Sequence, residues 1–368
     1  MANTQNEVVL KIKDSREADF NFIRKVSEAV LNIILKLWAQ CGTALLTIIL
    51  FYWIYGGFIA FLFVFFAFTG LLYHIPDEII FHPSQPHYSR IYVPSPKLYG
   101  LQMFENIFLK THDGIKINAV FIKHKSQSPD TLLPTIVYLH GNAGNIGHRL
   151  PNVKSLCEYV KCNVLLVEYR GYGLSEGYPS EKGMYEDVRA AVEFLLQRSD
   201  IDKNKIIIFG RSLGGAVAVD IACDEFFSQY IFCVILENTF TCIPDVAVSI
   251  SGWKFLSKVP MWCLKNKFNS IAKIKKLSVP VLFLSGLADA LIPPYMMLDL
   301  YNNCLCSSKQ IVKFNAGSHN DTWQCANYYK SIKMFINKVE VEGPAFRQAH
   351  TEVIHNDIKS PSAQIHDI

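Results

Sequence analysis

The sequence predicts an α/β fold, in which a mostly parallel sheet is covered by helices on both faces and preceded by a membrane-spanning helix. Three observations lead to this prediction. Apolar strand-like runs alternate with helical segments over residues 106–339, a pattern typical of parallel sheets. Residues 37–76 contain no Asp, Glu, Lys or Arg. Ser212, flanked by glycines, directly follows one of the strand-like runs, which indicates a reactive side chain at one edge of the sheet.

Composition argues against several kinds of partner. The net charge is +4 over 368 residues without a basic block, so we expect no nucleic-acid partner. Nine of the ten cysteines lie scattered beyond the apolar run, and we expect most of them to be buried as small apolar side chains. Cys304 and Cys306 lack the second ligand pair that a zinc site needs. We therefore expect neither a metal nor an organic cofactor.

The apolar run is predicted to anchor the chain in a membrane. Its centre, 44–73, exceeds the roughly 20 residues that a spanning helix needs, and it begins too far from Met1 for a cleaved signal peptide. Gly56-Gly57 could form a hairpin turn, but each half would then hold only about 15 residues, so one long tilted helix over 37–76 is favoured. Residues 19–40 form either a helix on the membrane surface or a simple extension of the span.

Flanking charges favour a single-pass type II signal-anchor, with residues 1–36 in the cytosol and the large domain in the lumen or outside. Basic residues precede the run and acidic residues follow it: Arg24, Lys25 and Lys36, then Asp77 and Glu78. The lipid bilayer is therefore a predicted partner.

A proline-rich connector, 77–105, leads into a regular order of elements. A hairpin through Asp113-Gly114 opens the series, and later strands alternate with helices. The predicted strands are 106–111, 116–123, 135–140, 163–168, 205–209, 232–236, 279–285 and 310–314. An aromatic and apolar insert at about 238–276 either overhangs the site as a lid or packs on the sheet as ordinary helices. Residues 340–368 are polar and are predicted to be disordered.

Ser212 is the predicted nucleophile. It lies in Gly210-Arg211-Ser212-Leu213-Gly214, which matches the G-x-S-x-G pattern of a sharp turn that exposes a serine hydroxyl at the top of a sheet. Bulkier neighbours would block the turn and the packing of the next helix. A serine hydroxyl is a weak nucleophile, so it needs a histidine base that is itself oriented by a carboxylate.

Asp289 and His319 are predicted to supply these two groups. In a sheet of this type the carboxylate and then the histidine follow the serine, each just past a later strand. Asp289 follows the run 281–286, and His319 follows the final run 311–314. Their order and their places at strand ends make a chance coincidence improbable.

Other polar residues nearby are assigned structural roles. Asp245, in the insert, is interpreted as a solvated or capping residue, and Asp321 as a residue that shapes its loop. His140 is expected to hold the loop that follows its strand. His148 has no evident role.

Acyl transfer also needs donors directed at the oxyanion that develops in the transition state. The N–H group of Leu213, at the start of a helix, is one candidate. The N–H group of Asn142, in the glycine-rich loop 140–145, is the other. The glycines of this loop could instead serve a plain turn or a phosphate cradle, but neither a Walker lysine nor a G-x-G-x-x-G spacing is present.

At these residues the chain resembles the α/β-hydrolase superfamily over roughly 106–339, and more narrowly the membrane-anchored proteins of the α/β-hydrolase-domain-containing series. The resemblance is carried by four strings of sequence, 140–152, 209–218, 285–294 and 319–325. It implies an α/β-hydrolase fold, a single-pass type II anchor and a triad of Ser212, Asp289 and His319. It also marks Asn320, in Asn320-Asp321-Thr322, as a candidate glycosylation site, although a sugar beside His319 would be awkward.

These observations together predict a membrane-anchored serine hydrolase that cleaves an ester or thioester of a lipid or acylated substrate. Related members of the superfamily remove palmitoyl groups from protein cysteines, which keeps a thioester among the candidates. Two alternatives stay open: a serine peptidase or amidase, and a catalytically silent scaffold that uses the hydrolase fold for binding.

Overall fold

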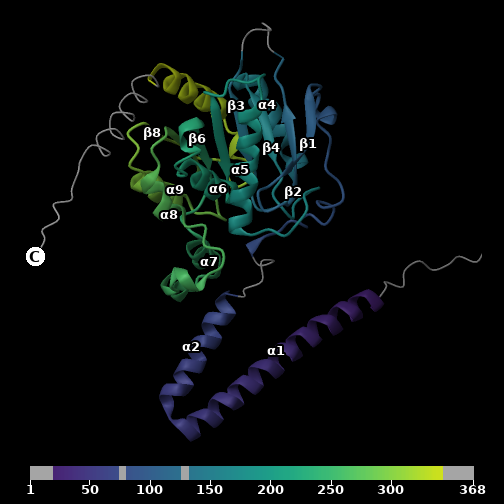
Figure 1. Cartoon of the computed structure of the whole chain (residues 1–368), viewed down its shortest axis with the longest axis vertical. Helices are drawn as coiled ribbons and strands as arrows, with labels where there is room; N and C mark the ends of the chain where they lie inside the picture. Colours follow the sequence, from purple (N-terminus) through teal and green to yellow (C-terminus); the bar gives the residue numbers. More distant parts are fainter. Residues whose placement is uncertain (1–19, 74–79, 126–131, 343–368) are drawn as a thin grey trace, which may run out of the picture. The chain divides into compact units, whose positions relative to one another are not determined.

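A computed structural model describes residues 20–73, 80–125 and 132–342. The chain divides into two compact units, with the boundary between Tyr73 and His74. The first unit is helical and apolar, and the second contains the sheet (Figure 1).

The N-terminal unit consists of two helices, α1 (Phe20–Tyr55) and α2 (Gly57–Tyr73). Gly56 separates them and has a φ of +82°, which glycine adopts readily. The rings of Phe51 and Phe63 lie 5.2 Å apart, whereas twelve residues of straight helix would separate them by about 18 Å. The single continuous helix predicted over 37–76 is therefore wrong, because the chain turns back at Gly56.

Among the described residues of this unit, one helix is long and apolar enough to cross a membrane. It covers Lys25–Tyr55, so the segment before the apolar run extends the same helix. The described part of α2 is shorter, with 17 residues. The polar stretch before Phe20 lies outside the described residues.

The second unit is built on an eight-stranded sheet with the order β1-β2-β4-β3-β5-β6-β7-β8. β1 pairs antiparallel with β2, β2 pairs antiparallel with β4, and every later pair is parallel. This confirms the predicted mostly parallel sheet. The strands are β1 (Phe104–Lys110), β2 (Lys116–Ile122), β3 (Thr135–Leu139), β4 (Asn163–Val167), β5 (Ile206–Arg211), β6 (Ile231–Glu237), β7 (Val281–Gly286) and β8 (Lys309–Phe314).

Helices cover both faces of the sheet. Alternate residues of each central strand point to opposite sides, and both sets are apolar and must be buried. Ile206 and Ile208 pack with one face, and Ile207 and Phe209 pack with the other. The first face is covered by α5 (Glu181–Gln197), α6 (Leu213–Ala222) and α9 (Pro294–Asn303). The second is covered by α4 (Leu150–Val160) and a C-terminal helix over 328–342.

The insert breaks the alternation as predicted. Between β6 and β7 the chain forms short helices instead of one long one: α7 (Ile243–Ser251), η4 (Lys254–Lys258), η5 (Met261–Cys263), α8 (Ser270–Lys273) and η6 (Ile274–Lys276), where η denotes a 3-10 helix.

The proline-rich segment ahead of β1 packs against the domain at Phe81 and His82. Phe81 is 1% exposed, and its ring lies 6.0 Å from that of Phe268 in the insert. His82 forms an isolated parallel bridge with Ala143. This segment therefore does more than connect two parts of the chain.

Expectations from the sequence also concern the cysteines and the polar C-terminal tail. Eight cysteines are free, and most are buried: Cys157, Cys162, Cys223, Cys233, Cys242, Cys304, Cys306 and Cys325. The C-terminal helix continues to residue 342 and so includes the first three residues of the predicted polar tail, 340–368. Residues 343–368 lie outside the described part of the chain.

Candidate active site

Ser212 sits on the sharp turn between β5 and α6 that the sequence pattern predicts. Its φ of +53° is unusual for a residue with a side chain, and its N–H group donates to the carbonyl oxygen of Glu237 at 2.9 Å. A Cβ on Gly214 would lie 2.1 Å from the carbonyl oxygen of Leu139, and one on Gly210 would lie 2.3 Å from that of Gly214. Both glycines are thus required by close backbone contacts that hold the turn.

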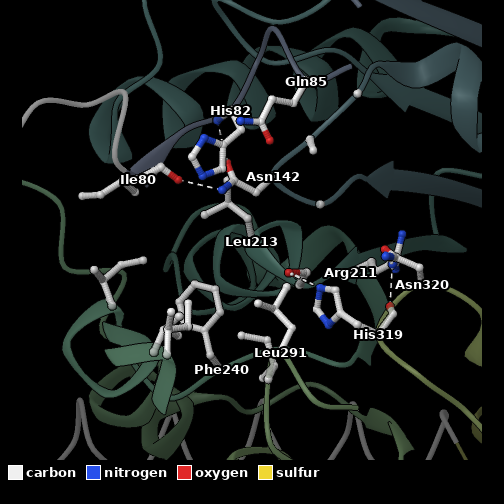
Figure 2. A pocket seen from close by; sticks show the side chains of 18 of the residues that line it. Ile80, His82, Gln85, Asn142, Arg211, Leu213, Phe240, Leu291, His319 and Asn320 are labelled. Atoms are coloured by element: carbon white, nitrogen blue, oxygen red, sulfur yellow. Dashed lines mark hydrogen bonds between the residues drawn. The ribbon is translucent and has the colours of Figure 1, made fainter. Parts of the chain in front are cut away.

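The structure brings the three predicted side chains together, although they lie far apart in the sequence. Oγ of Ser212 is 3.0 Å from Nε2 of His319, and Nδ1 of His319 is 2.7 Å from Oδ2 of Asp289. Figure 2 shows His319 in the pocket between Leu291 and Arg211. A neutral imidazole that donates from Nδ1 to the carboxylate is left with a lone pair on Nε2 to accept the serine proton.

Asp289 is held in this orientation by the backbone that follows it. Its Oδ1 accepts hydrogen bonds from the N–H groups of Leu291 at 2.9 Å and Ile292 at 2.8 Å. The residue is only 5% exposed. With Oδ1 fixed by two donors, Oδ2 remains for His319.

Three residues that the sequence analysis did not single out support the loop that carries His319. Arg211 donates from Nη2 to the carbonyl oxygen of His319, and its Nε lies 3.8 Å from Oε1 of the fully buried Glu237. Asn238 donates to the carbonyl oxygen of Ser318 at 3.1 Å. Their positions in the sequence could have indicated them, because Arg211 lies inside the serine motif, Glu237 ends β6 and Asn238 directly follows it.

Burial shapes the electrostatics of this support. It raises the pKa of the Glu237 carboxyl, which the nearby Arg211 guanidinium opposes. Oε2 of Glu237 also accepts a hydrogen bond from the hydroxyl of Tyr328 at 2.7 Å. A buried carboxylate is tolerated when it is paired and hydrogen-bonded in this way.

The glycine-rich loop places its backbone next to the serine. A Cβ on Gly141 would lie 3.3 Å from that of Ser212, so this loop and the serine turn are in close contact. Among the described residues, no hydrogen bond engages the N–H group of Asn142 or of Leu213, and both residues line the pocket. Two N–H groups without partners beside the hydroxyl are what an oxyanion hole requires.

His140 holds this loop, as the sequence analysis expected. Its Nδ1 lies 2.7 Å from the carbonyl oxygen of Gly141, and its Nε2 lies 3.0 Å from Oε1 of Glu168. The peptide that carries the Gly141 carbonyl also carries the Asn142 N–H group. Because a peptide is planar, fixing the carbonyl also fixes the direction of this N–H.

The side chain of Asn142 anchors the same loop from the other side. Its Nδ2 donates to the carbonyl oxygen of Ile80 at 2.6 Å, and its Oδ1 accepts from the hydroxyl of Tyr172 at 2.8 Å. The loop is therefore tied both to the segment ahead of the sheet and to the segment that follows β4.

A cavity of about 850 Å³ opens over Ser212. One wall is apolar and comes from the insert and from the segment after Asp289; it includes Phe240, Ile243, Val246, Ile250, Leu291 and Ile292. Figure 2 shows Phe240 and Leu291 on one side of Leu213 and His82 and Gln85 on the other. The insert thus forms a wall of the pocket, which agrees with the lid interpretation.

The other polar candidates take the following places. Asp321 accepts from the N–H group of Ser318 at 2.7 Å and shapes the loop, as expected. Asp245, in the first turn of α7, accepts a hydrogen bond from Thr241. His148, to which no role was assigned, lines the cavity. Asn320 is exposed at the pocket, and its Oδ1 accepts from Arg211 at 2.6 Å.

In the described ranges, no group of three or more His, Cys, Asp or Glu side chains is arranged to hold a metal ion. The three polar groups of the candidate site form hydrogen bonds with one another, and Asp289 also accepts from the backbone.

A serine turn, an ordered carboxylate and histidine, and a parallel sheet define the class of the α/β hydrolases. A family profile for the α/β hydrolase fold matches residues 134–262. The chain is 38% identical over 288 residues to alpha/beta hydrolase domain-containing protein WAV2 of Arabidopsis thaliana, an alignment that covers 74% of this chain and 91% of WAV2. The chain belongs to the α/β-hydrolase family.

Two fungal relatives have comparable similarity. Protein bem46 of Schizosaccharomyces pombe is 36% identical over 280 residues, covering 75% of this chain and 90% of the relative. The uncharacterized membrane protein YNL320W of Saccharomyces cerevisiae is 36% identical over 270 residues, covering 73% and 91%. The membrane label of this relative agrees with the apolar helix Lys25–Tyr55.

Solved structures agree on the fold. The Pyrococcus furiosus esterase Pf2001 superposes with a TM-score of 0.55 at 19% identity, covering 67% of this chain and 95% of the esterase. An α/β hydrolase from Vibrio vulnificus gives 0.55 at 20% identity, covering 67% and 89%.

Proposed function

We propose that this protein is a membrane-anchored serine hydrolase that cleaves an ester or thioester of a lipid or acylated substrate. The observation that carries the proposal is the hydrogen-bonded row Ser212–His319–Asp289, with distances of 3.0 and 2.7 Å, at the base of a cavity. Membership of the α/β-hydrolase family and the esterase among its structural neighbours support the reaction class.

Oγ of Ser212 attacks the carbonyl carbon while Nε2 of His319 takes the hydroxyl proton. Asp289 orients the imidazole and stabilises the imidazolium that forms. The N–H groups of Leu213 and Asn142 bind the oxyanion. His319 then returns the proton to the departing alcohol or thiol, which leaves an acyl-serine. Water, deprotonated by His319, attacks this acyl group, and the carboxylic acid and free serine are released.

The apolar wall of the cavity supports an acyl chain as the part of the substrate that lies there. Its residues come mainly from α7 and the loop after β7. The insert also exposes large apolar side chains that do not line the cavity, with Phe255 at 53% and Trp262 at 64%. Exposed apolar clusters of this kind favour contact with a lipid surface, which suits a chain that carries an apolar helix.

A type II orientation is part of the proposal, with the hydrolase domain on the lumenal or outer side. A glycan at Asn320 would establish that side. Because Oδ1 of Asn320 is already bonded to Arg211, an unmodified Asn320 is compatible with either orientation, and protease protection of the C-terminus in sealed microsomes decides between them.

Two experiments on the full-length protein in detergent test the function. The first measures labelling of Ser212 by a fluorophosphonate, with Ser212→Ala as the control. The second measures hydrolysis of ester, thioester and amide substrates that share one acyl chain. Ser212-dependent turnover of esters or thioesters is expected. Faster cleavage of the amide would favour a peptidase, and a folded protein whose Ser212 never reacts would favour a scaffold.

A further inference from the structure

Arg149 lines the cavity and has no carboxylate partner among the described residues. Other arginines of this domain that are at least partly buried all have one: Arg170 with Asp113 and Asp187, Arg189 with Asp220, Arg198 with Asp200 and Arg211 with Glu237. A guanidinium withdrawn from water is unfavourable unless a negative group compensates it. The buried Glu168 acts on Arg149 only from beyond ion-pair distance, so the guanidinium keeps room for a direct anionic partner supplied by a ligand.

The position of the Arg149 guanidinium is fixed by the glycine-rich loop. Nη2 donates to the carbonyl oxygen of Ala143, and the buried Nε has no hydrogen-bond partner among the described residues. Gly144 has a φ of +79°, and a Cβ there would lie 3.3 Å from Nη2 of Arg149 and 2.7 Å from Nδ1 of His148. Glycine at this position lets both side chains lie over the loop.

His148 adds a second polar group beside Arg149. Its Nδ1 accepts a hydrogen bond from the N–H group of Asn145 at 3.1 Å, and burial lowers its pKa. The neutral imidazole therefore carries its proton on Nε2, which has no partner in the described structure. Burial and the neighbouring Arg211 lower the pKa of Arg149, but a guanidinium stays charged at neutral pH.

Arg149 and His148 lie on the side of the cavity away from the insert. Ala143, which accepts from Arg149, forms a bridge with His82, and Figure 2 shows His82 across Leu213 from Phe240. If the acyl chain of an ester lies on the apolar wall, its alcohol part lies on the opposite side of the cavity, near Arg149. The two sides of the cavity are thus suited to the two halves of one amphipathic substrate.

We propose that Arg149 and the loop 143–148 form an anion subsite that binds a carboxylate or phosphate on the leaving alcohol or thiol of the substrate. This inference rests on the serine hydrolase function proposed above. It narrows the substrate to acyl esters or thioesters whose non-acyl part is negatively charged.

The test uses protection of Ser212 from a neutral fluorophosphonate in the full-length protein. Glycerol 3-phosphate should slow labelling of the wild type, whereas glycerol at the same concentration should not. In Arg149→Gln the concentration of glycerol 3-phosphate needed for half protection should rise about 10- to 100-fold, the range for loss of a hydrogen bond to a charged group. Arg149→Lys should lie between the two, because a lysine keeps the charge without the planar fork.

Lys154→Gln is the matched control, since it removes an exposed cation of α4 that does not line the cavity. Its protection curve should match the wild type. A second measurement compares kcat/KM for 1-oleoyl-glycerol 3-phosphate and 1-oleoylglycerol, which share one acyl ester. Their ratio should exceed about 10 in the wild type and fall toward 1 in Arg149→Gln.

The outcomes separate the two proposals. Ser212 that never reacts overturns the hydrolase function itself. Ser212 that reacts but is not protected by glycerol 3-phosphate overturns the anion subsite alone. Equal protection of wild type and Arg149→Gln also overturns it, because the anion then binds elsewhere.

Discussion

Arg211 donates from Nη2 to the backbone carbonyl oxygen of His319, and from the same nitrogen to Oδ1 of Asn320 at 2.6 Å. Arg211 directly precedes Ser212, so one side chain of the serine turn holds the loop that carries the candidate base. The candidate nucleophile and base are therefore linked through the backbone as well as through their own hydrogen bond.

We expect Arg211→Lys to lower kcat by about 10- to 100-fold, because displacement of a reacting group by about 1 Å can have an effect of this size. KM should change little, since the apolar wall is untouched. Kinetics of the preferred ester provide the measurement. Arg189→Lys, which alters ion pairs on α5 and α6, should retain wild-type kcat. An unchanged kcat in Arg211→Lys would show that other contacts hold the loop.

Asp289→Asn should reduce kcat by about 10,000-fold while the protein remains folded. The amide cannot accept the Nδ1 proton as the carboxylate does, so the imidazole loses the tautomer that can take the serine proton. Fluorophosphonate labelling of Ser212 should slow in parallel. Asp299→Asn, on the exposed side of α9, is the control. A small effect of Asp289→Asn would assign the carboxylate role to another residue.

The backbone N–H group of Asn142 can be tested by comparing two substitutions. Asn142→Pro removes the N–H group, and kcat should fall by about 100- to 1,000-fold. Asn142→Ala keeps the N–H but loses the side-chain bonds to Ile80 and Tyr172, so its loss should be smaller. Thermal melting establishes that both variants are folded. An equal fall of kcat in the two variants would mean that the side-chain hydrogen bonds of Asn142, and not its N–H group, are needed for activity.

Val246→Trp should shorten the acyl chains that the protein accepts. Val246 lies on α7 and lines the apolar wall, so a larger side chain would occupy the space of a long chain. The ratio of kcat/KM for long-chain to short-chain esters should fall by at least about 10-fold. Val248→Trp, on the same helix but not lining the cavity, should keep the wild-type ratio. A similar change in both variants would indicate a general disturbance of α7.

The ion pair between Asp113, in the hairpin, and Arg170 should make the stability of the protein depend on pH. Hydrogen bonds from Arg170 lower the pKa of Asp113 from 3.8 to about 2. Because the folded-state pKa lies below the unfolded value, this pair stabilises the protein above pH 4 and loses its effect as the pH falls from about 4 to about 2. Asp113→Asn should lower Tm at pH 6, and the difference should shrink across that range. A difference independent of pH would contradict the assignment.

Local patterns were sufficient for much of the sheet. The run Ile206-Ile207-Ile208-Phe209 is apolar on both faces, as a buried parallel strand must be. Gly210 and Gly214 stand where any Cβ would clash with the backbone of the serine turn or of β3. The order serine, carboxylate, histidine followed from the topology, because each must end a strand at the same edge.

The membrane segment shows where local patterns were insufficient. Composition predicts a helix on either side of Gly56 equally well, and only the packing of Phe51 on Phe63 shows that the chain turns back there. Glycine interrupts some helices and is tolerated in others, so contacts between the two halves decide the outcome.

The sequence by itself determined the fold class, the strand order along the chain and the three polar residues of the candidate site, because these depend on periodicity and on close local packing. The tertiary structure alone revealed the support from Arg211 and Glu237, the contribution of Ile80 and His82 to the cavity, and, among the described residues, the absence of an ion pair between Arg149 and a carboxylate. These features join segments that are distant in the chain. Such pairings depend on the three-dimensional packing of the sheet, the loops and the insert, which a pattern along one segment does not contain.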